Sequence, residues 1–276
     1  MSSGLQALYL RLERMKTLRI GVIGGGQLAR MMAPAALNLG IELSILCESE
    51  ETASARAVAQ APVGDYKDRQ TVLDFAESVD VVTFDHEHVP AEILHELVDK
   101  GVRVHPGPDA LIHAQDKIVM REAVERLGLP NPQWCAADTA ADVVAFGEKA
   151  GWPIIAKTPR GGYDGKGVEK LDSADDVERI SAWFERGQVL CEELVDFSRE
   201  LSALVARRPS GETAAWPVAH TIQVAGVCDE VIAPAQDLST ETAQAAQQTA
   251  LTIASELGVT CLLYTSLSGL ARQTVT

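Results

Sequence analysis

The residues best suited to chemistry in this 276-residue chain form a glycine-rich loop with cations on both sides. The apolar segment 153–157 leads into residues 161–167, which read Gly-Gly-Tyr-Asp-Gly-Lys-Gly. Glycines lack the Cβ atoms that would keep backbone N–H groups away from an anion, and they permit positive φ where successive amides converge. Lys157, Arg160 and Lys166 add positive charge. The pattern predicts a loop that covers phosphates, without Walker spacing; a flexible glycine hairpin with solvated lysines is the alternative.

A second glycine turn, residues 24–26, follows the expected strand 19–23 and precedes a helix that begins near Gln27. It satisfies G-x-G-x-x-[GA], and Glu48 stands near the end of the next strand, where dinucleotide-binding proteins place a ribose-binding acid. A helix N-terminus binds any phosphate ester, because its unpaired N–H groups and its dipole do not distinguish one ester from another. We therefore expect a substrate phosphate here. A nicotinamide dinucleotide or a purely structural turn are the alternatives, and no hydride-transfer site follows downstream.

Polar groups further along the chain could complete a nucleotide site. Residues 192–195 end an expected strand at a turn, and Glu200 follows on the next strand. Carboxylates and exposed backbone groups at such a corner accept ribose hydroxyls and pair with an adenine edge; a solvated acidic turn is the alternative. Arg207 and His220 lie on strands expected to be consecutive, so they are predicted to face one cleft, where an arginine would stabilise a developing anion.

Residues 85–88 read Asp-His-Glu-His, and His-x-His places two imidazoles on one side of a strand. A metal site would need a third ligand, and the sequence offers no clear candidate. We therefore interpret this segment as a substrate-contacting loop at the carboxyl end of the sheet.

Composition limits the class of protein. Hydrophobic residues make up 46% and charged residues 23%, the balance of a globular protein with a sizeable core, and the net charge is −15. That charge argues against a nucleic-acid partner or an anionic membrane surface. No stretch has the length of a transmembrane helix, and residues 1–16 lack the apolar core of a signal peptide. Five scattered cysteines without a C-x-x-C pair predict reduced, mostly buried thiols and a cytoplasmic location.

The elements expected to position these residues alternate between strands and helices from residue 18 onward, as in an α/β protein with a parallel sheet. In the first part we expect strands at 19–23, 43–47, 79–84 and 101–105 and a helix at 90–100. A helix at 114–127 then precedes a stop at Gly128. Beyond it we expect strands at 153–157, 168–170, 188–192, 201–207, 214–218, 220–224 and 227–232, with helices after the capping box Ser173–Asp176 and at 240–257.

Together, these motifs resemble the ATP-grasp family, and more narrowly the ATP-dependent N5-carboxyaminoimidazole ribonucleotide synthetases of purine biosynthesis. The matching stretches, in the family's order over about residues 18–260, are 24–31, 84–90, 115–117, 156–167, 192–197, 199–200 and 219–221. Several ordered motifs carry more weight than any one alone.

The resemblance implies a mixed α/β and α+β fold, with a Rossmann-like pre-ATP-grasp domain followed by an incomplete ATP-grasp fold. The corresponding divisions are an N-terminal extension at 1–17, a pre-ATP-grasp domain at 18–112, a small lid domain at 113–192, a partial C-terminal domain at 193–260 and an atypical tail at 261–276.

The implied reaction uses ATP and Mg²⁺. ATP phosphorylates bicarbonate to carboxyphosphate, and the amino group of 5-aminoimidazole ribonucleotide takes up the carboxyl group. Such chemistry needs alignment, charge neutralisation and exclusion of water, so the glycine loop is expected to move as a lid. The family also implies a homodimer.

By the same resemblance, ATP would contact the following residues: Lys117, Lys157, Gly161, Gly162, Tyr163, Asp164, Gly165, Lys166, Gly167, Glu192, Glu193, Leu194, Val195, Glu200 and His220. The catalytic candidates are Tyr163, Asp164, Lys166 and Arg207, and the ribonucleotide candidates are Gly26, Gln27, Glu87 and His88. We assign no metal ligand.

One departure from the family concerns residues 261–276, which contain no acidic residue where the family carries its Mg²⁺-binding acids. We therefore expect a truncated or frame-shifted end, poor binding of Mg-ATP, no catalysis and an unpaired sheet edge. Normal ATP turnover with aminoimidazole ribonucleotide would contradict this expectation. Other candidate functions are a formate-dependent glycinamide ribonucleotide transformylase, a biotin-carboxylase-like enzyme, a nicotinamide-dependent oxidoreductase and a non-catalytic nucleotide-binding module.

Overall fold

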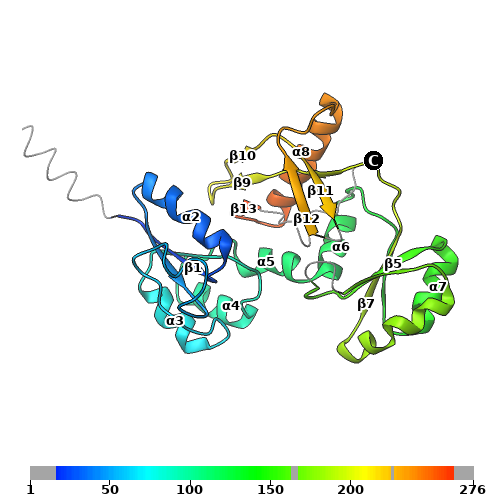
Figure 1. The fold of residues 1–276 in the computed structure, drawn as a ribbon, viewed down its shortest axis with the longest axis horizontal. Coiled ribbons are helices and arrows are strands. Elements are labelled where there is room, and N and C mark those ends of the chain that lie inside the picture. The colour runs from blue at the N-terminus through cyan, green and yellow to red at the C-terminus, as the bar shows by residue number, and fades with distance from the viewer. Residues whose placement is uncertain (1–16, 163–166, 225–226, 264–276) are drawn as a thin grey trace, which may run out of the picture. The chain divides into compact units, whose positions relative to one another are not determined.

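The structure is a computed structural model that describes residues 17–162, 167–224 and 227–263. The chain divides into two compact units, residues 1–108 and 109–276, each of which is described by itself (Figure 1). Tyr163, Asp164, Gly165 and Lys166, which include three of the four predicted catalytic residues, lie outside the described residues.

The first unit is built on a parallel sheet with the strand order β2-β1-β3. Its strands are β1 (Arg19–Ile23), β2 (Glu42–Leu46) and β3 (Val81–Phe84), and its helices are α2 (Gln27–Asn38), α3 (Arg69–Glu77) and α4 (Ala91–Asp99). The strands expected at 19–23, 43–47 and 79–84 and the helix expected at 90–100 are thus confirmed. Residues 101–105 add a single parallel bridge, between Val104 and Val82, rather than a full strand. Val22, Ile45, Cys47 and Ala29 form a buried cluster between the sheet and α2, as expected for parallel strands under helices.

The second unit begins with two helices where one was predicted. α5 (Pro108–Gln115) and α6 (Lys117–Arg126) are separated by Asp116, so the helix expected at 114–127 is confirmed over 117–126 but begins three residues later than predicted. Asp116 has extended backbone angles, φ −132° and ψ 115°, and its side chain accepts hydrogen bonds from the amides of Ile118 and Val119. A short carboxylate at this position favours an N-cap over a helix interior, which explains the break.

The small domain that follows is an antiparallel sheet with helices on one face. Its strand order is β4-β7-β5-β6, from β4 (Trp134–Ala137), β7 (Val189–Glu193), β5 (Ile154–Lys157) and β6 (Val168–Leu171). α7 (Ala140–Ala150) and the 3₁₀ helix η1 (Ala174–Arg186) pack against it, and both begin with capping boxes, Thr139 with Asp142 and Ser173 with Asp176. The second capping box confirms the sequence prediction.

Gly147 of α7 offers a test of this packing. A Cβ atom at residue 147 would lie 2.3 Å from the Trp152 ring, although alanine is the better helix former. Because the ring is packed in the core, we expect Gly147→Ala to lower the free energy of unfolding by about 1–3 kcal/mol. Urea denaturation measures this change, with Ala145→Gly on the exposed side of α7 as a control for helix propensity. A gain in stability for Gly147→Ala would contradict the packing.

The rest of the second unit contains two further sheets and a long helix. The strand orders of the two sheets are β10-β9-β13 and β12-β11-β8. The elements are β8 (Glu200–Ser202), β9 (Val205–Arg207), β10 (Thr213–Ala215), β11 (Ala219–Val224), β12 (Val227–Ile232), α8 (Thr240–Glu256) and β13 (Cys261–Leu263). The helix expected at 240–257 is confirmed. The single strand expected at 201–207 is wrong, because the chain passes from one sheet to the other between Ser202 and Val205.

The segment interpreted as an atypical tail, residues 261–276, begins with the strand β13. β13 pairs antiparallel with β9, with Cys261 opposite Arg207. β9 therefore has a partner on each side, and β10 and β13 are the outer strands of this sheet among the described residues. Val205 of β9 is fully buried in a cluster with Ile253 and Ala254 of α8 and Met120 and Val124 of α6, so this strand belongs to the core of the second unit.

Candidate functional site

The small sheet has a core face and a polar face, because side chains alternate along each strand. Ile154 and Ala156 of β5 and Cys191 of β7 belong to the core cluster under α7 and η1. The neighbours that alternate with them, Lys157 and Glu192, therefore stand on the opposite face. Since Glu192 is opposite Ile155 and Leu190 is opposite Lys157, the two charged side chains are diagonal neighbours on adjacent strands.

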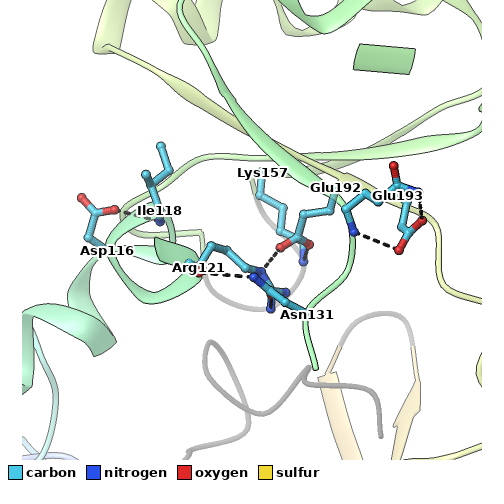
Figure 2. A network of polar contacts seen from close by, with 8 residues as sticks. Asp116, Ile118, Arg121, Asn131, Lys157, Glu192 and Glu193 are labelled. Atoms are coloured by element: carbon cyan, nitrogen blue, oxygen red, sulfur yellow. Dashed lines mark hydrogen bonds and ion pairs between the residues drawn. The ribbon is translucent and has the colours of Figure 1, made fainter. Parts of the chain in front are cut away.

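A buried charge cluster occupies this polar face. The Glu192 carboxylate, 4% exposed, pairs through Oε2 with Lys157 Nζ and through Oε1 with Arg121 Nε at 2.5 Å. Figure 2 shows both cations pointing toward this carboxylate. Arg121 Nη1 also donates to Asn131 Oδ1 at 2.9 Å, and Asn131 Nδ2 donates to the Arg121 carbonyl at 3.2 Å. The cluster thus joins α6, β5 and β7.

The electrostatics of this cluster favour an ionised Glu192. Burial raises the pKa of its carboxyl, but the charges of Lys157 and Arg121 and their hydrogen bonds outweigh burial and hold that pKa below its usual value. Lys157 and Arg121 thus bring two positive charges to the polar face of the sheet, and phosphate is the anion that lysine commonly binds as a point charge.

Sequence reasoning identified Lys157 and Glu192 but missed Arg121 and Asn131. Arg121 lies four residues after Lys117 on a helix whose apolar positions 120, 123 and 124 are buried, and it is itself 8% exposed. An arginine among buried positions of an amphipathic helix requires a buried acceptor. That was the available signal, although the sequence could not tell which acidic residue would serve.

Lys117 holds the base of the glycine loop. Its Nζ donates to the carbonyls of Thr158 at 3.1 Å, Pro159 at 3.4 Å and Gly161 at 2.9 Å. Arg160, between Pro159 and Gly161, pairs with Asp116, the N-cap residue of α6, at 2.9 Å. The start of α6 is therefore linked to the start of the loop by these contacts.

The glycine loop connects β5 to β6, which pair as an antiparallel hairpin. Its two ends meet where the Thr158 amide donates to the Gly167 carbonyl at 2.9 Å. Gly161, Gly162 and Gly167 have φ values of 69°, 80° and 71°, in the region that favours glycine. The described part of the loop thus meets the backbone requirement predicted from its composition.

The acidic corner that follows β7 is only partly exposed. Glu193 accepts hydrogen bonds from the Gln133 amide at 2.9 Å and from Gln133 Nε2 at 3.0 Å, which ties β7 to the segment before β4. Leu194 is 45% exposed and Val195 is half-buried. Leu194 is thus the exposed residue of the corner, whereas Glu192 is internal.

The sheets place the remaining candidates of this unit differently from the prediction. Arg207 lies on β9 and His220 on β11, in different sheets, so the expectation of consecutive strands is wrong. The Nη1 atom of Arg207 donates to the Val259 carbonyl at 3.3 Å. Glu200 is opposite Thr221 and His220 is opposite Leu201, so Glu200 and His220 stand on opposite faces of the β8–β11 pair.

In the first unit, two carboxylates surround the glycine turn that precedes α2. The Gly25 amide donates to Glu48 Oε2 at 3.0 Å, and the Ala29 amide donates to Asp85 Oδ1 at 3.1 Å. Burial raises the pKa of Asp85, and hydrogen bonds from the amides of Ala29 and Gly26 partly offset that rise. Gln27, the first residue of α2, is exposed beside this turn.

The segment 85–88 stands at the same end of the sheet, as predicted. His86 Nε2 lies 3.4 Å from Glu48 Oε1, and the His86 ring stacks at 4.5 Å from Tyr66 and 5.2 Å from His88. Burial and the neighbouring His88 lower the pKa of His86. A neutral imidazole beside an exposed His88 suits a polar substrate contact, and Glu87 is half-buried next to them.

Gly26 tests whether this turn must remain free of side chains. A Cβ atom at residue 26 would lie 2.2 Å from Asp85 Oδ2, so Gly26→Ala would displace a carboxylate that binds the α2 N-terminus. We expect a loss of about 1–2 kcal/mol in the free energy of unfolding. Gly107→Ala is the matched control, because no atom lies within 4 Å of its Cβ position. Equal stabilities of the two variants in urea denaturation would contradict the geometry.

The lowered pKa of Glu192 predicts an acid dependence of stability. The folded pKa lies below the unfolded value of about 4.3, so the cluster contributes its full stability above that pH and loses it as the pH falls further. The difference in unfolding free energy between wild type and Glu192→Gln should therefore shrink between pH 5 and pH 3. Carboxylates with similarly lowered pKa values, Asp68, Glu96 and Asp142, are common to both proteins and cancel. A constant difference would contradict the ion pairing.

Two negative findings apply to the described residues. Within them, no group of three or more His, Cys, Asp or Glu side chains is arranged to hold a metal ion. In the same ranges, no helix combines the length and the apolar character needed to cross a membrane.

Comparison with known families identifies the architecture. A model of the ATP-grasp domain matches residues 122–266, and a model of the ribonucleotide synthetase preATP-grasp domain matches residues 15–115. The chain therefore belongs to the ATP-grasp family. The preATP-grasp match covers the parallel sheet and its glycine turn, and the ATP-grasp match covers most of the charge cluster and the glycine hairpin.

The relatives are carboxyaminoimidazole ribonucleotide synthetases. The chain is 45% identical over 249 residues to the N5-carboxyaminoimidazole ribonucleotide synthase of Mycobacterium leprae, covering 87% of this chain and 57% of that protein. The synthetase structure from Thermus thermophilus is 30% identical, with a TM-score of 0.81 over 88% of this chain and 65% of that one. The Aspergillus clavatus enzyme in complex with ADP and 5-aminoimidazole ribonucleotide is 27% identical, with a TM-score of 0.77 over 86% and 62%. The chain thus spans less than two thirds of each relative.

Proposed function

We propose that this chain carries the nucleotide-binding and ribonucleotide-binding parts of an ATP-dependent N5-carboxyaminoimidazole ribonucleotide synthetase. The observation that carries the proposal is the buried cluster of Lys157, Glu192 and Arg121, next to the glycine hairpin. A relative that binds ADP and 5-aminoimidazole ribonucleotide has the same fold and supports the assignment of both ligands.

The described residues fit a bound nucleotide. Lys157 would pair with a phosphate on the polar face of the small sheet, while Arg121 keeps Glu192 ionised and in place. The glycine hairpin, fastened by Lys117, would bring backbone amides over the phosphates. The backbone of Leu194 and Val195 would meet the adenine edge. ATP supplies the phosphoryl group that activates bicarbonate as carboxyphosphate, and the enclosed site would keep water from that species.

The described residues do not form a Mg²⁺ site. Both oxygens of Glu192 already pair with cations, and no cluster of hard oxygen ligands stands among the described positions. Mg²⁺ accompanies ATP in this family, but we assign it no ligand and no step here.

In the first unit, we propose that the turn at Gly26 and Gln27 meets the ribonucleotide phosphate and that Glu87 and His88 contact the same substrate. The family assignment supports this interpretation over a nicotinamide dinucleotide. The roles expected for Arg207, Glu200 and His220 remain predictions from the sequence. The same is true of the homodimer and the cytoplasmic location.

Binding measurements test the proposal directly. Titration calorimetry should show binding of ADP and of ATP but not of NAD, and 5-aminoimidazole ribonucleotide should raise the thermal midpoint. Binding of NAD without ADP would favour the oxidoreductase alternative. Where ATP hydrolysis is measurable, stimulation by bicarbonate rather than formate separates this reaction from the formate-dependent transformylase.

A further inference from the structure

Two cysteines lie directly opposite each other in the sheet that carries the charge cluster. Cys135 of β4 is the register partner of Cys191 of β7 in an antiparallel pair. Opposite residues in such a pair point to the same face, with Cα atoms about 4.5–5.5 Å apart. That separation falls within the range of about 4.4–6.8 Å that a disulfide spans. The backbone therefore already places the two thiols where a bond can form.

The two thiols differ in access. Cys191 is fully buried in the core under α7 and η1, whereas Cys135 is only partly buried. Cys135 also lines an open cavity of about 790 Å³ between β4, α7 and the segment that follows α6, together with Phe146 and Lys149. A small oxidant can thus reach Cys135 from solvent, with Cys191 behind it.

The thiols also interact with each other. Hydrogen bonding with Cys191 lowers the pKa of the Cys135 thiol, while the same bond and burial raise the pKa of Cys191. The accessible sulfur is therefore the one with the greater thiolate character, and thiolate is the reactive form. The buried partner is positioned to resolve an oxidised intermediate on Cys135.

We propose that Cys135 and Cys191 form a reversible disulfide, an oxidation site for hydroperoxides in the sheet that holds Lys157 and Glu192. The Cys135 sulfur attacks one oxygen of hydrogen peroxide, the O–O bond breaks, and the thiol proton leaves with the second oxygen as water. Cys191 sulfur then attacks the resulting sulfenic acid, forming the S–S bond, and the hydroxyl leaves with the Cys191 proton as a second water. Two thiols are oxidised and one peroxide is reduced.

Cys191 lies one residue from Glu192 of the charge cluster, but on the other face of the sheet. Glu192 follows Cys191 directly on β7, and its side chain points away from the thiols. The disulfide would join β4 to β7 at the position next to Glu192. Because a cross-link restricts the unfolded chain, the oxidised protein should have a higher thermal midpoint than the reduced one.

Peptide mapping of the full chain tests the proposal. Trypsin cuts after Arg126, Lys149, Arg186 and Arg199, so residues 127–149 and 187–199 each carry one of the two cysteines. After treatment with equimolar hydrogen peroxide, we expect a cross-linked pair of these peptides, the loss of two of the five thiols, and recovery of both thiols with dithiothreitol. The triple variant C47S, C228S, C261S should behave in the same way.

Several outcomes would overturn the proposal. These are consumption of Cys228 or Cys261 while Cys135 and Cys191 remain free for alkylation, a cross-link between chains, or a stable sulfenic acid on Cys135 trapped by dimedone. In Cys135→Ser, Cys191 should stay reduced under the same treatment, and the oxidation-dependent rise in thermal midpoint should vanish. Should the triple variant fail to fold, the map of the wild-type chain decides alone.

Discussion

Replacing Glu192 with glutamine is expected to lower the free energy of unfolding by about 3–5 kcal/mol. The substitution preserves shape but removes the one carboxylate that both Lys157 and Arg121 contact. Both cations are buried, with Lys157 9% and Arg121 8% exposed, so each would lose its counter-ion in a medium that solvates charge poorly. Urea denaturation at pH 7 measures the loss.

A surface ion pair provides the control for this change. Glu212 pairs with Arg208 at 2.8 Å, but both side chains are largely exposed. Glu212→Gln makes the same chemical change and should alter stability by less than about 1 kcal/mol. Similar losses for Glu192→Gln and Glu212→Gln would show that the internal cluster is hydrated and contributes no more than a surface pair.

Much of the fold could be predicted from local signals. The parallel strands of the first unit are short apolar runs, and the helices at 91–99 and 240–256 lie between start and stop residues that the sequence shows, Pro90 and Gly101 for the first and Ser239 and Gly258 for the second. The errors arose where a local pattern was continuous but the tertiary partners changed. Residues 201–207 form one apolar run. The strand at its start, β8, pairs with β11, whereas the strand at its end, β9, pairs with β10 and β13.

The candidate site was predictable in its charges but not in its pairing. Lys157, Glu192 and the glycines could be identified because their residue types and spacing indicate their chemistry. Arg121 did not, because its importance depends on a contact with a residue 71 positions away. Likewise, Glu200 and His220 were predicted as site residues, but the pairing of their strands and their opposite faces follow only from the register.

The structure also changes the meaning of the acidic corner. From the sequence, residues 192–195 offered two carboxylates to a ribose. In the fold, Glu192 is an internal counter-ion and Glu193 binds Gln133, so the two carboxylates stabilise the corner itself.

Replacing Lys157 with methionine is expected to weaken ADP binding by about 10- to 150-fold, the range that corresponds to a charged hydrogen bond of about 1.5–3 kcal/mol. Methionine retains the length of the side chain but removes the ammonium group. Glu192 would keep Arg121 as its partner, while the positive charge proposed to pair with the phosphate would be lost. Titration calorimetry with ADP measures the affinity, and circular dichroism checks that the variant is folded.

Lys170→Met is the matched control for that measurement. Lys170 lies on β6 opposite Ile155, on the same face of the sheet, but it is about half exposed and pairs with Asp172 at the surface. Because its charge is solvated and screened, the affinity for ADP should change by less than about twofold. If both variants bound ADP as tightly as the wild type, the polar face of the small sheet would not be the phosphate site. Weakening by Lys170→Met alone would place the phosphates toward the outer strand instead.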